Sequence, residues 1–375
     1  MTATDPTTEP EDGLTELEFR DPDRASALRD RLEDLVASLD DPVRIVHVCG
    51  THEETIAEFG IRSILPDGLT VAMGPGCPVC VTDSAEISEA VALAEAGHTV
   101  VTYGDMIDVP GRDGSLADAR DAGADVRVVY SADEAVVIAE ETEEQVVFFA
   151  VGFETTAAPT ASVLRADPPS NFSVLSAHKY VPPAMDIVAA RPDTRVDGFL
   201  AAGHAATITG TDVYEPIARN HEMPVVVGGF EPLDVLYGLV ELVEAIAEDS
   251  ATVTNAYPRC VSETGNAAAT AALWDVFERV SGQWRGIAEV PGANLSIRPE
   301  YAEYDALERF EIDLPGSDGR QTDCLCGDIM AGHARPSDCE LFGTECTPGD
   351  PVGACMVSDE GPCRIAREFG GDRSP

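Results

Sequence analysis

A cluster of six cysteines lies near the end of this 375-residue chain: Cys324, Cys326, Cys339, Cys346, Cys355 and Cys363. They are interleaved with Gly and Pro in a stretch with little periodic apolar content, so thiolate–metal bonds would have to supply its order. Zinc modules usually present tight C-x₂₋₄-C pairs, whereas the one close pair here is Cys324-Leu-Cys326. We therefore predict an iron–sulfur site. Spacing alone leaves open which four cysteines bind.

Cys49 is the second residue that could do chemistry. It directly follows a β-branched run, and Thr51-x-x-Glu54 is a capping-box pattern that predicts a helix beginning at Thr51. A helix N-terminus lowers the pKa of a nearby thiol and favours the thiolate, and His52 is placed to add a hydrogen bond or a proton. The alternative is a buried, inert cysteine.

Cys77-Pro-Val-Cys80 follows a Gly-Pro-Gly turn. Such a C-x-x-C pair can close as a disulfide or chelate a soft metal. The isolated Cys260 is interpreted as structural.

Three further residues follow apolar runs. Glu154, in Gly-Phe-Glu-Thr-Thr, is a candidate acid, although a Glu at a helix start is often only a cap. His178 and His204 are placed to face a shared cleft, but each is more typical of a structural histidine.

These residues need strands to position them, and two series of short apolar runs supply candidates. The first series is 44–48, 69–72, 99–103 and 126–130, and the second is 145–151, 172–176, 198–202 and 224–227. Ala- and Glu-rich segments between the runs read as helices, which indicates a parallel α/β sheet. The two series repeat at an offset of about 100 residues, so we predict two similar α/β halves.

Cys49, Cys77 and Glu154 each lie just after a predicted strand. Open α/β sheets bind ligands beyond the carboxyl ends of their strands. We therefore predict two parallel-sheet halves that face a cleft, followed by an irregular cysteine-rich region. The predicted divisions are an acidic tail and helix (1–40), two α/β domains (41–142 and 143–255), and a helical linker with an iron–sulfur domain (256–375). Helices are expected at 23–40, 232–248 and 263–280.

Charge excludes one class of partner. The chain has 68 acidic and 24 basic residues and a net charge of −44, which argues against nucleic acid, because binding phosphates requires basic patches. The acid is spread evenly, as in the solvated coat of a protein from a salt-rich cell, and we expect a halophilic source. The N-terminus has no signal-peptide pattern and no run is long enough to span a membrane, so we expect the cytoplasm.

Nucleotide-binding motifs are absent. Lys179 is the sole lysine and stands in no G-x-x-x-x-G-K-[ST] context, and no G-x-G-x-x-G follows a strand. An ordinary nucleotide-driven enzyme is therefore not expected.

The motifs CGTHE, GPGCPVC, TYGDM and GFETT, with the tail segments CLCGDIMAG, DCELFG and GACMVSDEGPC, together resemble the HypD family of hydrogenase maturation proteins. The match runs from about Arg44 to Cys363. The resemblance implies a scaffold on which the iron of nickel–iron hydrogenase acquires two cyanides and one carbon monoxide, forming a transient Fe(CN)2CO centre. It also implies two partners: a small HypC-like chaperone that shares the iron, and a HypE-like carrier that delivers cyanide.

The resemblance also implies roles for particular residues. Cys49 would bind the nascent iron with His52 beside it, Cys77 and Cys80 would be a redox-active pair, and Glu154 would be a cleft acid. Many family members carry a second histidine where Glu54 stands here, so no metal role is assigned to Glu54.

In the tail, the resemblance implies a 4Fe–4S cluster held by Cys324, Cys339, Cys346 and Cys363. Cys326 and Cys355 would remain as a dithiol close to the cluster, similar to ferredoxin–thioredoxin reductases. A cluster, a dithiol and a C-x-x-C form a plausible electron relay. Whether such a redox-active scaffold counts as an enzyme is a matter of definition. Two other classes stay open: a cluster-dependent disulfide reductase acting on protein thiols, and a structural metalloprotein adaptor.

Overall fold

The computed structural model describes residues 19–112, 114–191, 195–312 and 323–370. Most of the expected acidic tail, residues 1–18, lies outside this part of the chain. The predicted first helix is confirmed as α1 (Pro22–Ala37), which begins where the Asp21 side chain accepts hydrogen bonds from the amides of Asp23 and Arg24. Leu28, Leu32 and Val36 are its buried face.

All eight predicted strands are present, arranged in two parallel sheets. Sheet A has the order β2 (Leu69–Met73), β1 (Val43–His47), β7 (Gly198–Ala202), β8 (Val225–Gly228) and β9 (Val253–Asn255). Sheet B has the order β4 (Val126–Val128), β3 (Thr99–Thr102), β5 (Val146–Gly152) and β6 (Phe172–His178). Every residue of β5 is buried, as expected for a parallel strand covered on both faces.

The strands do not pair as the two series along the chain suggested. Sheet A takes β1 and β2 from the first series and β7 and β8 from the second, while sheet B takes β3 and β4 from the first and β5 and β6 from the second. The expectation that each series forms its own sheet is therefore wrong. The chain leaves sheet A after β2, builds all of sheet B, and returns at β7 to pair with β1, so that Ile45 lies opposite Gly198.

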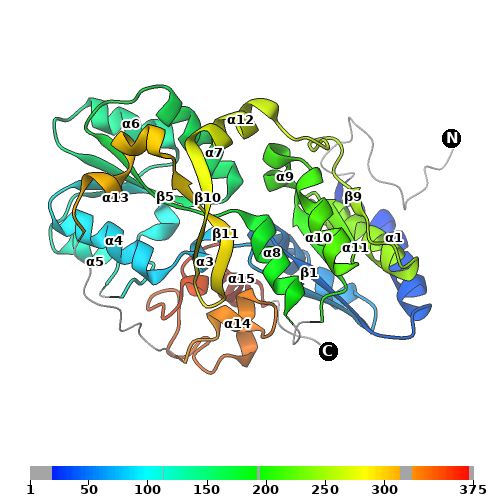
Figure 1. Cartoon of the computed structure of the whole chain (residues 1–375). Coiled ribbons are helices and arrows are strands. Elements are labelled where there is room, and N and C mark those ends of the chain that lie inside the picture. The colour runs from blue at the N-terminus through cyan, green and yellow to red at the C-terminus, as the bar shows by residue number, and fades with distance from the viewer. Residues whose placement is uncertain (1–18, 113, 192–194, 313–322, 371–375) are drawn as a thin grey trace.

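Helices cover both sheets (Figure 1), and short 3₁₀ turns connect several of them. The helices that follow α1 up to the end of sheet A are α2 (Gly50–Glu58), α3 (Pro78–Val81), α4 (Ser84–Glu95), α5 (Leu116–Asp121), α6 (Ala132–Glu140), α7 (Glu154–Arg165), α8 (Val181–Ala190), α9 (Gly203–Thr209), α10 (Glu215–His221) and α11 (Pro232–Ala247). The later ones are α12 (Ala267–Val276), α13 (Ala306–Arg309), α14 (Cys326–Met330) and α15 (Pro362–Phe369). The 3₁₀ turns are η2 (Ile61–Ile64), η3 (Gly104–Met106), η4 (Asp212–Tyr214), η5 (Pro299–Tyr304), η6 (Pro336–Asp338) and η7 (Ala354–Met356).

The segment after α11 differs from the prediction. The helix expected over 263–280 ends at Val276, and an antiparallel hairpin follows, made of β10 (Phe277–Trp284) and β11 (Ala288–Ile297). Pro291 and Gly292 lie inside β11 and are the reason that the stretch read as irregular. A two-stranded ribbon tolerates them because its outer edge needs no ladder donor. Figure 1 shows the yellow hairpin running between the two sheets towards α14.

The cysteine-rich tail is irregular, as predicted, but it is not separate from the protein core. Cys326, Cys346, Cys355 and Cys363 are buried in the same apolar cluster as Val48 of the β1 loop. The tail therefore gains order from packing against both the C-terminal ends of the strands and the hairpin. No described helix has both the length and the apolar character required to cross a membrane.

Candidate functional site

Cys49 lies at the carboxyl end of β1 and is the N-cap residue of α2. The helix therefore begins at Gly50, one residue earlier than the capping-box pattern predicted. The Cys49 carbonyl accepts a hydrogen bond from the Glu53 amide (3.2 Å), and the side chain is 1% exposed. The thiol is thus held at the helix start, inside the protein.

Burial controls the protonation of this thiol. It raises the pKa of Cys49 to about 12, and the nearby Glu360 carboxylate adds to the rise, while the amides of His52 and Thr51 at the helix start oppose it. The expected thiolate is therefore not the state of the metal-free protein. Desolvation outweighs the helix terminus at this depth, and a bound cation would be needed to displace the proton.

The His204 side chain lies beside this thiol. It follows β7, the neighbour of β1, and its Nδ1 atom lies 3.8 Å from Cys49 Sγ. Burial lowers the pKa of His204, so the ring is a neutral proton acceptor. The sequence analysis considered His204 structural. In the sequence, the position of Gly203-His204 directly after a predicted strand could have indicated a site residue. The pairing of β1 with β7, which brings His204 to Cys49, could not be read from the sequence.

His52 does not point its ring at Cys49. Its Nε2 atom donates to the Gly229 carbonyl (2.8 Å), and the ring packs against Phe230 at 4.9 Å between centroids. Burial lowers the pKa of His52 to about 3, and Nδ1 has no protein partner. His52 therefore orients the β8–α11 loop, and only its backbone reaches the thiol.

A buried ion-pair network beneath α2 was not predicted. The Glu53 carboxylate accepts hydrogen bonds from Arg62 (2.6 and 2.9 Å) and from His47 Nε2 (2.8 Å). Although burial opposes ionisation, Arg62 and His47 hold the pKa of Glu53 well below its ordinary value. His47 Nδ1 lies 3.1 Å from the Cys49 carbonyl oxygen. The network therefore fixes the backbone of Cys49.

Cys77 and Cys80 form a disulfide at the start of α3, and both are fully buried. The preceding Gly76 packs against the backbone of Cys49, and its carbonyl accepts from the Gly50 amide (3.1 Å). A Cβ at Gly76 would overlap the nitrogen of Cys49 and lie 2.6 Å from its Cα. The C-x-x-C turn and the Cys49 turn thus lie against each other at the same edge of sheet A.

Glu154 starts α7, at the carboxyl end of β5 in sheet B. One carboxylate oxygen accepts from the Val181 amide (3.1 Å), and the other, buried oxygen has no protein partner. Burial raises the pKa of Glu154 to about 7, and His204 lies near enough to oppose the rise. Burial raises the pKa of Tyr214, and the neighbouring Glu154 and Cys49 add to the rise. Loops of sheets A and B therefore meet here.

His178 is not part of this group. Its ring lies edge-on to Phe277 (5.4 Å) and its Nδ1 is 3.4 Å from Ser176 Oγ. Burial lowers the pKa of His178 to about 3. Cys260 is exposed and free.

The tail thiols form a connected chain. Cys324 and Cys355 donate to Cys326, which holds the pKa of Cys326 well below its ordinary value, and Cys355 also contacts Cys363. Gly353 lies against Cys324 and Cys326, since a Cβ on Gly353 would be 2.6 Å from Cys326 Sγ and 2.8 Å from Cys324 Sγ. Cys346 accepts from the Val352 amide (3.4 Å).

These residues fit a soft metal group in donor chemistry, because six free thiols meet in one buried region and no disulfide consumes them. Among residues 19–370 outside the undescribed gaps, no three His, Cys, Asp or Glu side chains surround a single point that one metal ion could occupy.

The tail closes over the Cys49 turn. Glu360 packs on Gly50, where a Cβ would be 2.8 Å from the Glu360 carbonyl, and its carboxylate accepts from Thr51 Oγ1 (3.5 Å). Ser358 Oγ donates to Asp105 (3.2 Å) in the TYGDM segment. Glu360 was not predicted to lie at this site.

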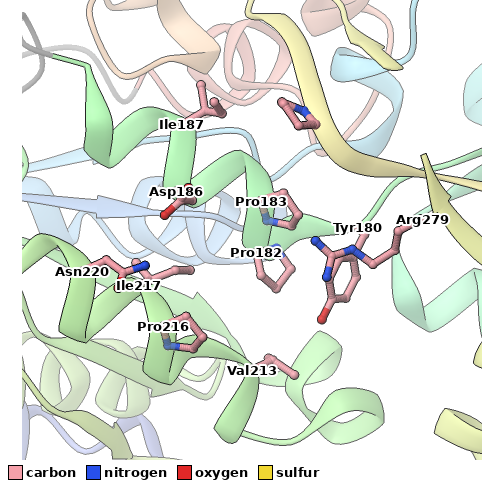
Figure 2. A pocket seen from close by; sticks show the side chains of 11 residues that line it. Tyr180, Pro182, Pro183, Asp186, Ile187, Val213, Pro216, Ile217, Asn220 and Arg279 are labelled. Atoms are coloured by element: carbon pink, nitrogen blue, oxygen red, sulfur yellow. The ribbon is translucent and has the colours of Figure 1, made fainter. Parts of the chain in front are cut away.

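A cavity of about 490 Å³ is lined by residues on both sides of Val181, among them Tyr180 and Pro182 (Figure 2). Tyr180 and Arg279 lie together at one end, with the guanidinium 4.9 Å from the ring centroid. Pro182 and Pro183 of α8 face Pro216 of α10 across it. Since Val181 donates to Glu154, the cavity wall and the buried acid share one segment.

Comparison with known proteins agrees with the motifs. The family model described as "HypD: Hydrogenase formation hypA family" matches residues 23–370. The chain is 42% identical over 351 residues to the hydrogenase maturation factor HypD of Rhizobium leguminosarum bv. viciae, covering 89% of this chain and 91% of that protein. It is 42% identical over 336 residues to HypD of Cupriavidus necator (86% and 88%) and 40% identical over 372 residues to HypD of Azotobacter vinelandii (95% and 97%). The chain therefore belongs to the HypD family of hydrogenase maturation factors.

Proposed function

We propose that this chain is the scaffold on which the iron of nickel–iron hydrogenase acquires two cyanides and one carbon monoxide, with Cys49 as the protein ligand of that iron. The observation that carries the proposal is the position of Cys49 at the carboxyl end of a central strand, 3.8 Å from His204. A soft thiolate suits low-valent iron.

The surrounding residues support proton handling during iron binding. The Cys49 thiol must lose its proton, and Nδ1 of the neutral His204 ring, 3.8 Å away, is placed to accept it. Glu154, whose pKa burial raises to about 7, can take up or release a proton near neutral pH on the sheet B side. His52 and the Glu53 network hold the turn in place.

The second part of the proposal concerns the groups that would exchange electrons with the iron centre. The Cys77–Cys80 disulfide abuts the Cys49 turn, and Cys326 contacts Cys355, so a disulfide and a dithiol lie on the same side of the core. Cys324, Cys339, Cys346 and Cys363 are the residues we propose for a 4Fe–4S cluster. Such a cluster supplies or accepts one electron at a time.

The proposed partners are a HypC-like chaperone that shares the iron and a HypE-like cyanide carrier. This proposal rests on family membership. Because Cys49 is 1% exposed, a partner must reach it where the tail segment around Glu360 covers the turn.

A cluster-dependent disulfide reductase is the second candidate, favoured by the contact between Cys326 and Cys355. Infrared absorption of the protein purified from hydrogenase-producing cells separates the two. The scaffold gives cyanide and carbon monoxide stretches, and a reductase or a purely structural adaptor gives neither.

The deciding variant is Cys49→Ser, with Cys260→Ser as the matched control because Cys260 is a free cysteine with an exposed side chain. Cys49→Ser should fold and keep the tail cluster but lose both sets of infrared bands and hydrogenase maturation. Cys260→Ser should keep them. Wild-type maturation by Cys49→Ser would mean that the iron is assembled elsewhere.

A further inference from the structure

The tip of the β10–β11 hairpin contacts three loops of the candidate site. On one side, Trp284 stacks on Phe153, with 6.0 Å between ring centroids. Phe153 is the N-cap residue of α7 and directly precedes Glu154. The tip is thus anchored to the sheet B side of the site by a buried aromatic pair.

On a second side, Arg285 supports the helix that carries the disulfide. Its amide donates to the Val81 carbonyl (2.9 Å) and its Nε to the Thr82 carbonyl (2.8 Å). Its Nη2 donates to the Pro110 carbonyl (2.9 Å). A four-residue helix such as α3 leaves its last carbonyls without helical donors, so Arg285 supplies them and fixes the turn that begins at Cys77.

On the third side, Gly286 meets the start of α14. Gly286 has a φ of +72°, and a Cβ on it would lie 2.9 Å from the Gly327 nitrogen and closer still to the Gly327 Cα. Gly327 directly follows Cys326. The Cys326 and Cys355 sulfurs also oppose the lowering that burial imposes on the pKa of Arg285, which agrees with a position of both thiols on this side of the guanidinium.

We propose that the hairpin tip is the element that aligns the Cys77–Cys80 disulfide with the Cys326 and Cys355 thiols for thiol–disulfide exchange, and that Arg285 is its positioning residue. The inference deepens the proposed function and rests on its redox part. Helices α3 and α14 pack together, as do α3 and the η7 turn that holds Cys355, and the tip touches the first two. In Figure 1 the tip lies between α3 and α14.

The exchange balances within the protein. The Cys326 thiolate attacks one sulfur of the Cys77–Cys80 bond, forms a mixed disulfide and releases the other sulfur as a thiolate that takes up a proton. Cys355 then loses its proton, attacks Cys326 and releases the second upstream thiol. One disulfide is reduced by two electrons while one dithiol is oxidised by two.

Alignment matters because the sulfurs are buried and come from opposite ends of the chain. A displacement of about 1 Å between reacting groups can lower a rate by up to about a hundredfold. The Lys side chain keeps the charge of Arg but carries all its donors on one nitrogen, so it cannot place separate nitrogens at the Thr82 and Pro110 carbonyls as Arg285 does.

The test uses the full-length protein and compares Arg285→Gln and Arg285→Lys with Arg279→Gln. Arg279 lies on the same hairpin, away from the tip, where its Nε donates to the Gly292 carbonyl. Protein with the upstream disulfide is moved from pH 5, where exchange is slow, to pH 8. Samples are quenched in acid and alkylated, and the oxidised pair is identified by peptide mass. Cluster absorption and the melting temperature are recorded for every variant.

We expect both Arg285 variants to slow exchange by at least about tenfold with cluster absorption unchanged, and Arg279→Gln to match wild type. Wild-type exchange in Arg285→Gln overturns the inference, as does equal slowing in Arg279→Gln. If Arg285→Lys alone matches wild type, charge and not position is the cause, which also overturns it.

Hydrogen exchange in the wild-type protein tests the same idea without a variant. The amide of Arg285 and the amides of α14 should open as one unit, and independent opening would contradict the alignment role. If the wild-type chain transfers no disulfide at all, the redox part of the proposed function fails together with this inference. If wild type exchanges and the Arg285 variants equal it, only this inference fails.

Discussion

Cys49 Sγ lies 3.8 Å from His204 Nδ1, although the two residues are 155 positions apart in the chain. The contact exists because β1 and β7 are hydrogen-bonded neighbours whose carboxyl ends release both residues at the same edge. A thiol with a pKa raised to about 12 faces an imidazole whose pKa is lowered by burial. Both side chains are therefore neutral in the metal-free protein.

Replacing His204 should show whether the Nδ1 atom matters. Asn places its amide near the position of Nδ1, whereas Gln places its amide near that of Nε2. We expect His204→Asn to retain more iron than His204→Gln, because only Asn can face the Cys49 sulfur. Iron content per protein after anaerobic loading is the measurement. Equal iron in both variants and wild type would leave His204 with a packing role only.

Adding a methyl group at Gly76 should displace Cys49. A Cβ there would overlap the Cys49 backbone, and neither backbone can move without breaking the bond between the Gly76 carbonyl and the Gly50 amide. We expect Gly76→Ala to lower the free energy of unfolding by about 1–3 kcal/mol and to abolish iron loading. Gly349→Ala is the control, since no atom lies within 4 Å of a Cβ at Gly349. Urea unfolding and iron content test both, and a Gly76→Ala protein as stable as the control would refute the packing argument.

Glu154 should make stability depend on pH. Burial raises its pKa in the folded protein to about 7 from the ordinary 4.5, so the folded state holds the proton over a range in which the unfolded chain has lost it. Its contribution is complete below about pH 4.5 and is lost as the pH rises to about 7. Glu154→Gln mimics the protonated form.

The Glu154→Gln protein should therefore match wild type near pH 5 and exceed it near pH 8, by up to about 3 kcal/mol. Thermal unfolding at the two pH values measures the difference, with Glu300→Gln, in η5 outside the site, as the control. A difference that is the same at both pH values would show that Glu154 does not titrate in this range.

The tail cysteines should divide into two classes. We expect Cys339→Ala and Cys346→Ala to remove the visible absorption of the cluster and to lower the melting temperature, because a cluster binds the tail segments together. Cys326→Ala and Cys355→Ala should keep the cluster and lose one titratable thiol pair. If Cys326→Ala or Cys355→Ala removes the absorption, a different four cysteines bind the cluster. The same conclusion follows if Cys339→Ala and Cys346→Ala both keep normal iron and sulfide.

The strands and the residues that follow them could be predicted from the order of residues along the chain. Buried parallel strands are short apolar runs, and a residue that follows such a run leaves the sheet at its carboxyl end wherever the strand is placed. For this reason the sequence alone identifies Cys49, Cys77 and Glu154 as residues at the ends of strands. The sequence also identifies the family, because the family motifs combine rare residues at particular spacings.

The neighbours of each strand could not be predicted in this way. A parallel crossover passes over the sheet and can return to either side of an existing strand, so periodicity does not tell whether β1 pairs with β3 or with β7. That choice alone brings His204 to Cys49. The tertiary structure also places the β10–β11 hairpin between the disulfide and the tail thiols. The Pro and Gly residues of this hairpin made its sequence look irregular.

Burial decides the remaining chemistry. The sequence predicts a thiolate for a cysteine at a helix start, yet burial, with the Glu360 carboxylate adding to its effect, raises the pKa of Cys49 to about 12. Desolvation sums over atoms from distant segments, and only the folded chain brings them together. Residue type and spacing therefore predict which groups can react, and tertiary packing determines which protonation state each one holds.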